Sequence, residues 1–297
     1  MPTETPQPFA HAGFEGKIGV ARADITPPIG IYARNWGAAT HDVAEGVHRP
    51  LTLTVLTIQD VPENPPFVLA TADLGWWRTP EDEYFVRGAV VEGLGIPASQ
   101  VMLNLTHTHS GPALCLEDAD KPGGHLIAPY LQALQKAFQS TTAHALETAQ
   151  PATLEWTYGK CTLAKERDLP DPDADRYLTG FHPNTPADDT LLVGRISDTN
   201  GKYLATVVNY ACHPVTLAWQ NRLLSPDFVG AMRETVEANT DNAPCLFLQG
   251  ASGELAARET YTTTEIADNQ GRELGYAVLS ALMGMLPPRT RLRYAGV

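Results

Sequence analysis

Alternating and wholly apolar runs of strand length determine which folds are open to this chain of 297 residues. Leu51–Ile58 alternates apolar and polar residues with a period of two, and Phe67–Leu74 follows after a short turn, so a hairpin is expected. Other expected strands cover 17–26, 101–107, 153–164, 191–196, 203–211 and 245–248. Helical patterns occupy 80–94, 129–149 and 265–285. These patterns predict an α/β fold, with mixed β-sheets flanked by α-helices.

Another helix is expected after residue 225, with Ser225 as its cap and Pro226 at its first position. Residues 1–15 are expected to be a disordered lead-in, and 16–297 a single domain. The last residues, 291–297, begin a strand and then stop, so the domain is expected to be incomplete at its C-terminus.

Three long loops are expected between these elements. The loop that ends near residue 46 carries Tyr32 and Trp36, which fit either a pocket wall or a surface loop pinned by Trp36. The loop 110–126 has the composition of a mobile cover. Residues 166–190 lack periodicity and are rich in Pro, Asp and Asn, so a long loop is expected there as well.

Composition excludes several function classes. Net charge is −13, with 21 Lys and Arg against 34 Asp and Glu, which argues against a nucleic-acid partner. No run approaches the roughly 18 apolar residues of a membrane-spanning helix, and the N-terminus lacks a signal-peptide pattern, so a cytoplasmic protein is expected. The four cysteines are widely spaced, which fits neither a disulfide framework nor a cysteine zinc site, and Cys212 and Cys245 lie in apolar runs where free buried thiols are expected. Oligomeric state is left open.

Histidines cluster where predicted strands end. Val101–Pro112 ends in His107 and His109, which alternation along a strand would place on one face. His213 follows another strand, and the small-residue turn 249–254 follows a third. Strand carboxyl ends are where α/β sheets bind ligands, and imidazole is a common zinc ligand. The pattern therefore favours a metal site, although loop backbone could also satisfy two such polar residues. Asp73 could support that site or, as we favour, cap the next helix.

Six segments stand out in chain order: Gly19–Gly30, Gly46–Leu51, Thr106–Pro112, Asn209–Pro214, Leu224–Gly230 and Phe247–Glu254. They span nearly the whole chain, and Thr106–Pro112 and Asn209–Pro214 are quite specific together. In this order they resemble the N-terminal domain of the neutral/alkaline (non-lysosomal) ceramidase family.

The resemblance implies a zinc-dependent amidohydrolase that cleaves the N-acyl bond of ceramide-like lipids in sphingolipid metabolism. It implies that His107 and His213 bind Zn2+, with His109 beside the metal in a substrate-binding or proton-handling role. Arg167 is the expected match for a family arginine that binds polar groups of the substrate. We further expect Glu254 to orient its turn or to assist as a base.

Two departures from the family pattern open alternatives. Ala256 stands where the family has its active-site serine, and Ser252 is out of register with that position. The family's remaining zinc ligands, a Glu and a Tyr, are expected in a later part of the domain that this chain does not contain. The alternatives are a catalytically incomplete fragment or binding protein that retains the fold, and a metallohydrolase acting on another amide or an ester.

Overall fold

A computed structural model describes residues 8–9, 13–259, 263–290 and 292–293. Its centre is an eight-stranded sheet with the order β14-β12-β11-β7-β2-β4-β5-β6. The strands are β2 (Gly13–Asp24), β4 (Thr52–Gln59), β5 (Phe67–Ala72), β6 (Val101–Leu105), β7 (Gln150–Lys160), β11 (Thr190–Asp198), β12 (Tyr203–Tyr210) and β14 (Cys245–Gln249). The pairs at the two edges, β5 with β6 and β12 with β14, are parallel, and the inner pairs are antiparallel. The sheet is therefore mixed, as predicted, and β4 and β5 pair as the expected hairpin.

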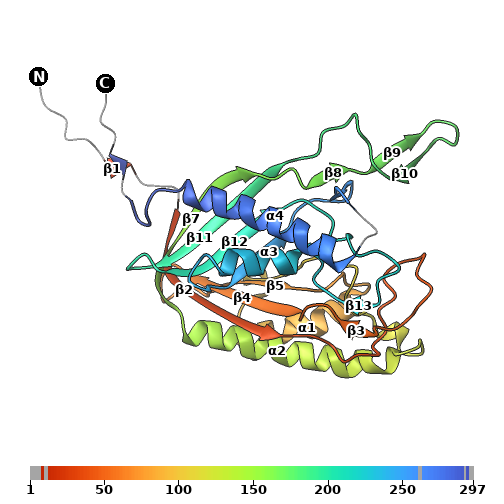
Figure 1. Ribbon diagram of the computed structural model, residues 1–297. Coiled ribbons are helices and arrows are strands. Elements are labelled where there is room, and N and C mark those ends of the chain that lie inside the picture. Colours follow the sequence, from red (N-terminus) through yellow and green to blue (C-terminus); the bar gives the residue numbers. More distant parts are fainter. Residues whose placement is uncertain (1–7, 10–12, 260–262, 291, 294–297) are drawn as a thin grey trace, which may run out of the picture.

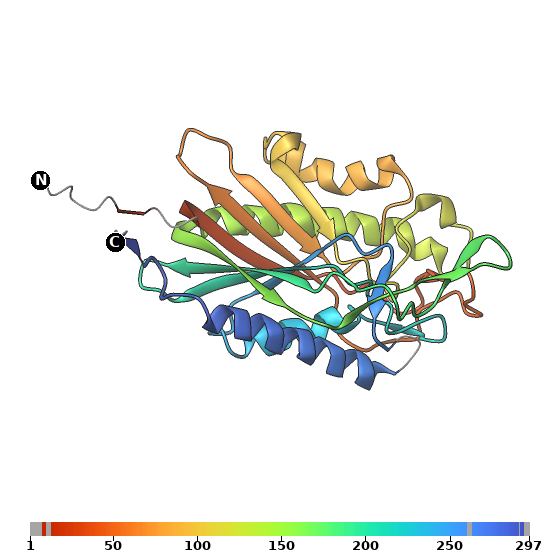
Figure 2. The same ribbon diagram turned by 90° about the horizontal axis from the view of Figure 1, so that it is seen from above.

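Two pairs of helices cover the sheet from opposite sides. The helices are α1 (Pro80–Gly93), α2 (Ile127–Glu147), α3 (Phe228–Glu237) and α4 (Thr264–Met283). Figure 2 shows the strands lying between α1 and α2 on one side and α3 and α4 on the other. Figure 1 shows the same layers from the side. This arrangement confirms the predicted α/β class with helices flanking a mixed sheet.

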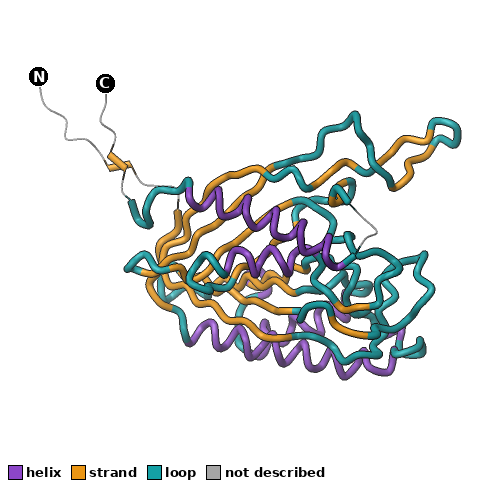
Figure 3. Tube along the Cα trace, viewed as in Figure 1, coloured by secondary structure: helices purple, strands orange, loops and turns teal. Residues whose placement is uncertain are grey.

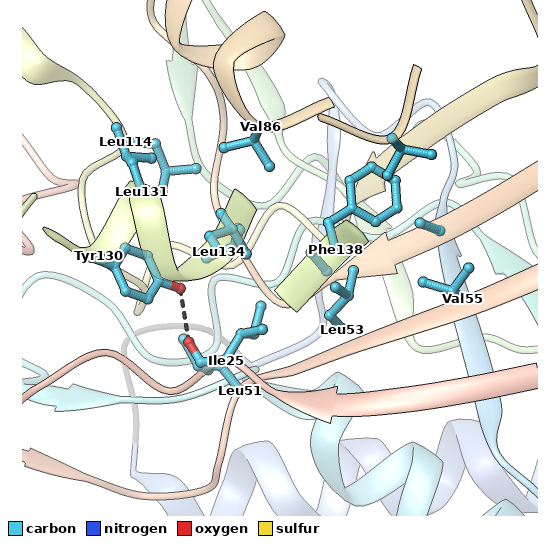
Figure 4. Close-up of a cluster of buried hydrophobic side chains, with 14 of the residues drawn as sticks. Ile25, Leu51, Leu53, Val55, Val86, Leu114, Tyr130, Leu131, Leu134 and Phe138 are labelled. Atoms are coloured by element: carbon cyan, nitrogen blue, oxygen red, sulfur yellow. Dashed lines mark hydrogen bonds between the residues drawn. The ribbon is translucent and has the colours of Figure 1, made fainter. Parts of the chain in front are cut away.

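The alternation of side chains along each strand divides the core into clusters. On β4, Leu53 and Val55 face α1 and α2 and pack with residues such as Phe138. Figure 4 shows this cluster, in which the Tyr130 hydroxyl also donates a hydrogen bond of 2.8 Å to the Ile25 carbonyl. A matching cluster joins β12 and β14 to α3 and α4. The wholly apolar run of β14 sends Cys245 and Phe247 into this second cluster and Leu246 to the opposite face, because side chains alternate along a strand.

A third cluster lies on the inner face of the sheet and joins its two halves. Leu56 of β4 belongs to this cluster together with Val207 of β12 and Leu246 of β14. Where the two edges of the sheet approach each other, the Thr71 hydroxyl of β5 and the Asn104 amide of β6 both donate to the Phe247 carbonyl of β14, at 2.6 and 3.2 Å. The sheet is thus curled enough to bring its two edges together. The carboxyl ends of the edge strands consequently meet in one region.

Four two-stranded pairs supplement the large sheet. They are β1 (Pro8–Phe9) with β16 (Leu292–Arg293), β3 (Gly46–Val47) with β13 (Leu223–Leu224), β8 (Ala164–Glu166) with β15 (Leu255–Ala257), and β9 (Asp168–Asp171) with β10 (Arg176–Thr179). The β9–β10 hairpin corrects the expectation of a structureless loop over 166–190, and it projects from the body of the protein (Figure 3). The loop 110–126 contains two short 3-10 turns, Leu116–Asp118 and Gly124–Leu126.

Several expected boundaries also change. Strand β2 begins at Gly13, inside the lead-in expected over 1–15, and most of the rest of that lead-in lies outside the described residues. Most of the segment 291–297 also lies outside them. The cap of α3 is Asp227, whose carboxylate accepts from the Phe228 N–H, while Ser225 lies two residues earlier and accepts from the Asp227 N–H. All four cysteines are buried and free, as expected for Cys212 and Cys245. Within the described residues, no helix is long and apolar enough to cross a membrane.

Candidate metal centre

The three predicted histidines meet where strands β6 and β12 end. β6 stops at Leu105, so His107 and His109 lie in the segment that follows it and not on one strand face as predicted. The backbone N–H of His107 still donates to the Leu74 carbonyl at 2.9 Å, which keeps this residue beside the end of β5. His107 has a left-handed backbone with φ of 67°. This turn, rather than strand alternation, brings the two rings to one place.

The ring nitrogens of the three histidines converge. The Nε2 atom of His213 lies 3.0 Å from Nε2 of His107 and 3.1 Å from Nε2 of His109. One ligand atom from each residue lies within 4.8 Å of the others. Tetrahedral coordination with bonds of about 2.0–2.1 Å places two zinc-bound nitrogens roughly 3.3 Å apart. The observed spacing is therefore close to what a shared zinc ion requires.

The opposite ring nitrogen of His213 fixes its tautomer. Its Nδ1 donates a hydrogen bond of 2.9 Å to the Ser252 carbonyl, so a lone pair remains on Nε2. His107 makes a comparable hydrogen bond with the Gly75 backbone. Nδ1 of His109 lies toward the Asn35 backbone but has no hydrogen-bond partner of normal geometry. Lone pairs that face one another repel, and a bound cation would relieve this repulsion. The donor set therefore fits a zinc ion.

The turn 249–254 is the part of the sequence motif that orients His213. The Gln249 side-chain amide donates to the Ser252 hydroxyl at 2.6 Å and to the Cys212 carbonyl at 3.0 Å. These bonds tie the end of β14 to the residue before His213. Ser252 itself is buried, and its carbonyl receives the imidazole. Its role in the structure is thus to position a potential ligand through the backbone.

Burial keeps all three imidazoles neutral. Burial first, and then His213 and His107, lower the pKa of His109 to about 3. Burial also lowers the pKa of His213 to about 4, and it lowers the pKa of His107. The positive charge of Arg167 lowers the pKa of each ring further. Neutral imidazole is the form that binds metal, so the site is prepared for a cation near pH 7.

Two tryptophans wall the histidine cluster. The ring of Trp36 lies 4.7 Å from that of His109, between ring centroids. Trp76 lies 4.8 Å from His109 and 5.3 Å from His107. The long loop near Trp36 therefore supplies a wall of the site, one of the two roles considered for it. Trp76 was not predicted, although its position just after a strand end next to the site could have indicated it.

Arg167 and Glu254 come together through their backbones. The Arg167 N–H donates to the Glu254 carbonyl at 2.8 Å, and the guanidinium Nε donates to the Gly253 carbonyl at 2.9 Å. Arg167 thus lies near the histidines, and its charge acts on all three. The Glu254 side chain is exposed and is outside the cluster of potential metal ligands found among the described residues. Ala256 forms a parallel bridge with His213, so the residue that the resemblance matches to a family serine is directly beside the site.

Asp73 has neither of the roles considered for it. The cap of α1 is Thr79, whose hydroxyl accepts from the Asp82 N–H. Both carboxylate oxygens of Asp73 instead accept from the guanidinium of Arg233 on α3, at 2.8 and 2.6 Å. The two residues are buried. This ion pair holds the chain just after β5. The next residue, Leu74, accepts a hydrogen bond from the His107 N–H through its carbonyl.

The lowered pKa values predict that the metal-free protein loses stability in acid. Between the ordinary histidine pKa of 6.5 and the folded values near 3 and 4, the unfolded chain binds more protons than the folded one. The free energy of unfolding should therefore fall as pH decreases from 6.5 toward 4. At pH 5 the expected loss is about 2 kcal/mol for each of His109 and His213. Urea unfolding of chelator-treated protein at pH 7 and pH 5 measures it.

The control for this experiment is His109→Gln, which removes one of these proton sites. Asp227, whose pKa burial raises to about 6, contributes in the opposite direction, but it does so equally in both proteins. The variant should lose about 2 kcal/mol less than the wild type between the two pH values. Identical pH profiles for the two proteins would show that His109 is not held neutral by the fold.

Solved structures with a similar fold identify the architecture. No protein-family model matches the chain. A neutral ceramidase from Pseudomonas aeruginosa aligns with a TM-score of 0.69 at 18% sequence identity, over 90% of this chain and 45% of that protein. The chain has a ceramidase-like fold. A structure described as a ceramidase complexed with C2 gives the same TM-score and identity, over 44% of its length. The chain thus spans less than half the length of the proteins that share the ceramidase-like fold.

Proposed function

We propose that this chain carries the metal centre of a zinc-dependent hydrolase that cleaves an N-acyl amide bond in ceramide-like lipids. The observation that supports this most strongly is the convergence of three neutral imidazole Nε2 atoms on one point. The ceramidase-like fold adds to this support, because the histidines occupy the motifs that resemble that family. A zinc ion held by His107 and His213 would lower the pKa of a bound water molecule and polarise the substrate carbonyl.

The other residues of the site would divide the remaining tasks. His109, whose Nε2 lies beside the proposed ligands, would take a proton from the attacking water and pass it to the leaving nitrogen as the C–N bond breaks. Oxygen from water forms the new C–O bond, so the products are a carboxylic acid and an amine. Arg167 would bind polar groups of the substrate, while Glu254 would orient the turn 249–254. Trp36 and Trp76 would exclude bulk water from the histidine cluster.

A second candidate keeps the metal centre but changes its use. Ala256 lies next to His213 and offers no hydroxyl at the position of the family serine. This observation favours either a metallohydrolase for a different amide or ester, or a protein that retains the fold and binds without catalysis. The candidates differ in whether a zinc-loaded chain turns over a ceramide-like amide, only another amide or ester, or no substrate at all.

Zinc-loaded protein tests the proposal against ceramide, a short N-acyl amide and the matched ester. We expect hydrolysis of an amide that requires zinc and is lost on treatment with a chelator. His109→Gln should retain zinc while its turnover falls by about 100-fold or more, the effect of losing a general acid. Loss of zinc in this variant would instead make His109 a third ligand. Protein that binds zinc but cleaves none of these substrates would contradict the proposed hydrolase.

A further inference from the structure

A small ribbon next to the metal centre presents one strongly polar face. Strands β8 and β15 pair antiparallel, so that Lys165 lies directly opposite Ala256. Directly opposite residues share a face, and that face continues two residues along each chain to Arg167 and Arg258. Ala256 also bridges to His213 in parallel register. The polar face of the ribbon is therefore continuous with the proposed metal centre.

The other face of the same ribbon is buried and, apart from Glu166 opposite Leu255, apolar. Ala164, Leu255 and Ala257 belong to the core cluster under α3 and α4. This packing fixes which way the ribbon faces, because turning it over would expose three core residues and bury three cations. The positions of Lys165, Arg167 and Arg258 are thus set by the core beneath them.

The charge on this face contrasts with that of the chain as a whole. The chain has a net charge of −13, yet the face carries three cations. Within the part of the chain that the structure describes, neither Lys165 nor Arg167 forms an ion pair, and the Arg167 guanidinium donates only to the Gly253 carbonyl. Arg258 pairs with Glu273 at 2.7 Å, and Glu166 lines the same region. Glu254, which continues the register opposite Arg167, does not line the cavity beside this face, so Glu166 and Glu273 offset two of the three positive charges there and one remains.

The polar face borders a cavity of about 150 Å3. Its lining includes Lys165, Arg167, Arg258 and Ala256, and Phe181 adds an apolar wall. The Phe181 side chain is 59% exposed at the foot of the β9–β10 hairpin. A small cation-lined cavity beside an exposed aromatic ring suits a ligand that combines one negative charge with an apolar chain.

We propose that this cavity binds a carboxylate of the substrate, so that the substrate class is an N-acylated amino acid and not a neutral ceramide. The inference deepens the proposed function, and its catalytic part rests on it. One uncompensated positive charge matches a singly charged carboxylate better than a phosphate ester, which carries close to two negative charges. Guanidinium and ammonium groups bind carboxylates through charge-assisted hydrogen bonds, whereas Ala256 provides no hydroxyl to recognise a neutral alcohol group.

The test compares N-dodecanoylglycine with N-dodecanoylethanolamine, which have the same acyl chain and differ in the carboxylate. With zinc-loaded protein we expect kcat/KM to be at least about tenfold higher for the anionic compound. Lys165→Gln and Arg258→Gln should each reduce that ratio by about tenfold. The control is Lys136→Gln on the exposed face of α2, which should leave the ratio unchanged. Circular dichroism confirms that each variant is folded.

Calorimetry on metal-free protein separates this inference from the proposed function. Binding of N-dodecanoylglycine should be tighter than that of N-dodecanoylethanolamine by about tenfold, and Lys165→Gln should abolish the difference. If neither compound is cleaved but this preference is present, the hydrolase proposal fails and the carboxylate site stands. Equal or better binding and cleavage of the neutral compound would overturn the carboxylate site while leaving the hydrolase proposal intact.

Discussion

Replacing His213 with alanine is expected to remove the zinc-binding capacity of the protein. Its Nε2 atom lies within 3.1 Å of the Nε2 atoms of both other histidines, so it occupies the centre of the cluster. Loss of a residue that only orients a metal ligand typically lowers metal affinity by about 10–100-fold, and loss of a ligand itself should lower it further. We therefore expect a fall in zinc affinity of more than about 100-fold. Competition with a chromophoric chelator measures it at pH 7.

The control for this prediction is His144→Ala. His144 is an exposed residue of α2 and forms a 3.9 Å contact with Glu147. This variant should bind zinc as the wild type does, which would exclude a general effect of removing a histidine. A His213→Ala protein that remains folded and binds zinc with unchanged affinity would show that the cluster is not the metal site.

The second large effect is expected in stability, from Asp73→Ala. Asp73 is fully buried and Arg233 is 5% exposed, so the substitution leaves a guanidinium charge inside the protein without its partner. Such a broken buried pair typically costs 3–5 kcal/mol. The hydrogen bonds that Asp73 accepts from the Thr52 N–H and hydroxyl are lost as well. Urea unfolding should show a decrease in the free energy of unfolding of at least about 3 kcal/mol.

Two further variants identify the cause of this loss. Arg22 and Glu237 form another ion pair to α3, but their side chains are 25% and 19% exposed. Glu237→Ala should therefore cost less than Asp73→Ala, because water can still reach Arg22. The double variant Asp73→Leu/Arg233→Met should recover much of the lost stability, since it leaves no buried charge. A cost below about 1 kcal/mol for Asp73→Ala would contradict the assigned role of the pair.

The sequence predicted the elements that depend on local patterning. Leu53 and Val55 alternate with polar residues along β4, and this period-2 pattern alone identifies a strand, although the structure buries its other face as well, through Leu56. The histidines were predicted as a group because each follows a strand, and the edges of one curled sheet do bring them together. Arg167 was placed near the site from the resemblance, and its charge does act on the three rings.

Features that depend on tertiary contacts or on unusual backbone were not predictable. His107 turns the chain in a left-handed conformation, which residue type alone does not indicate for histidine. Asp73 looked like a helix cap because Asp commonly is one, but its partner Arg233 lies 160 residues away in the sequence. In the β9–β10 hairpin, three of the four residues of β9 are Asp or Pro, which local propensity assigns to loops. In each case a long-range contact or a specific turn overrides the local preference.

A crystal structure of the zinc-loaded chain with anomalous data at the zinc edge would show whether the histidine cluster holds a metal ion. We expect one zinc ion bonded to Nε2 of His107 and to Nε2 of His213, at about 2.0–2.1 Å from each nitrogen. The Nδ1 atom of His213 should keep its hydrogen bond to the Ser252 carbonyl in that structure. No anomalous peak at the histidine cluster under saturating zinc, or a peak only elsewhere on the protein, would contradict the proposed metal centre.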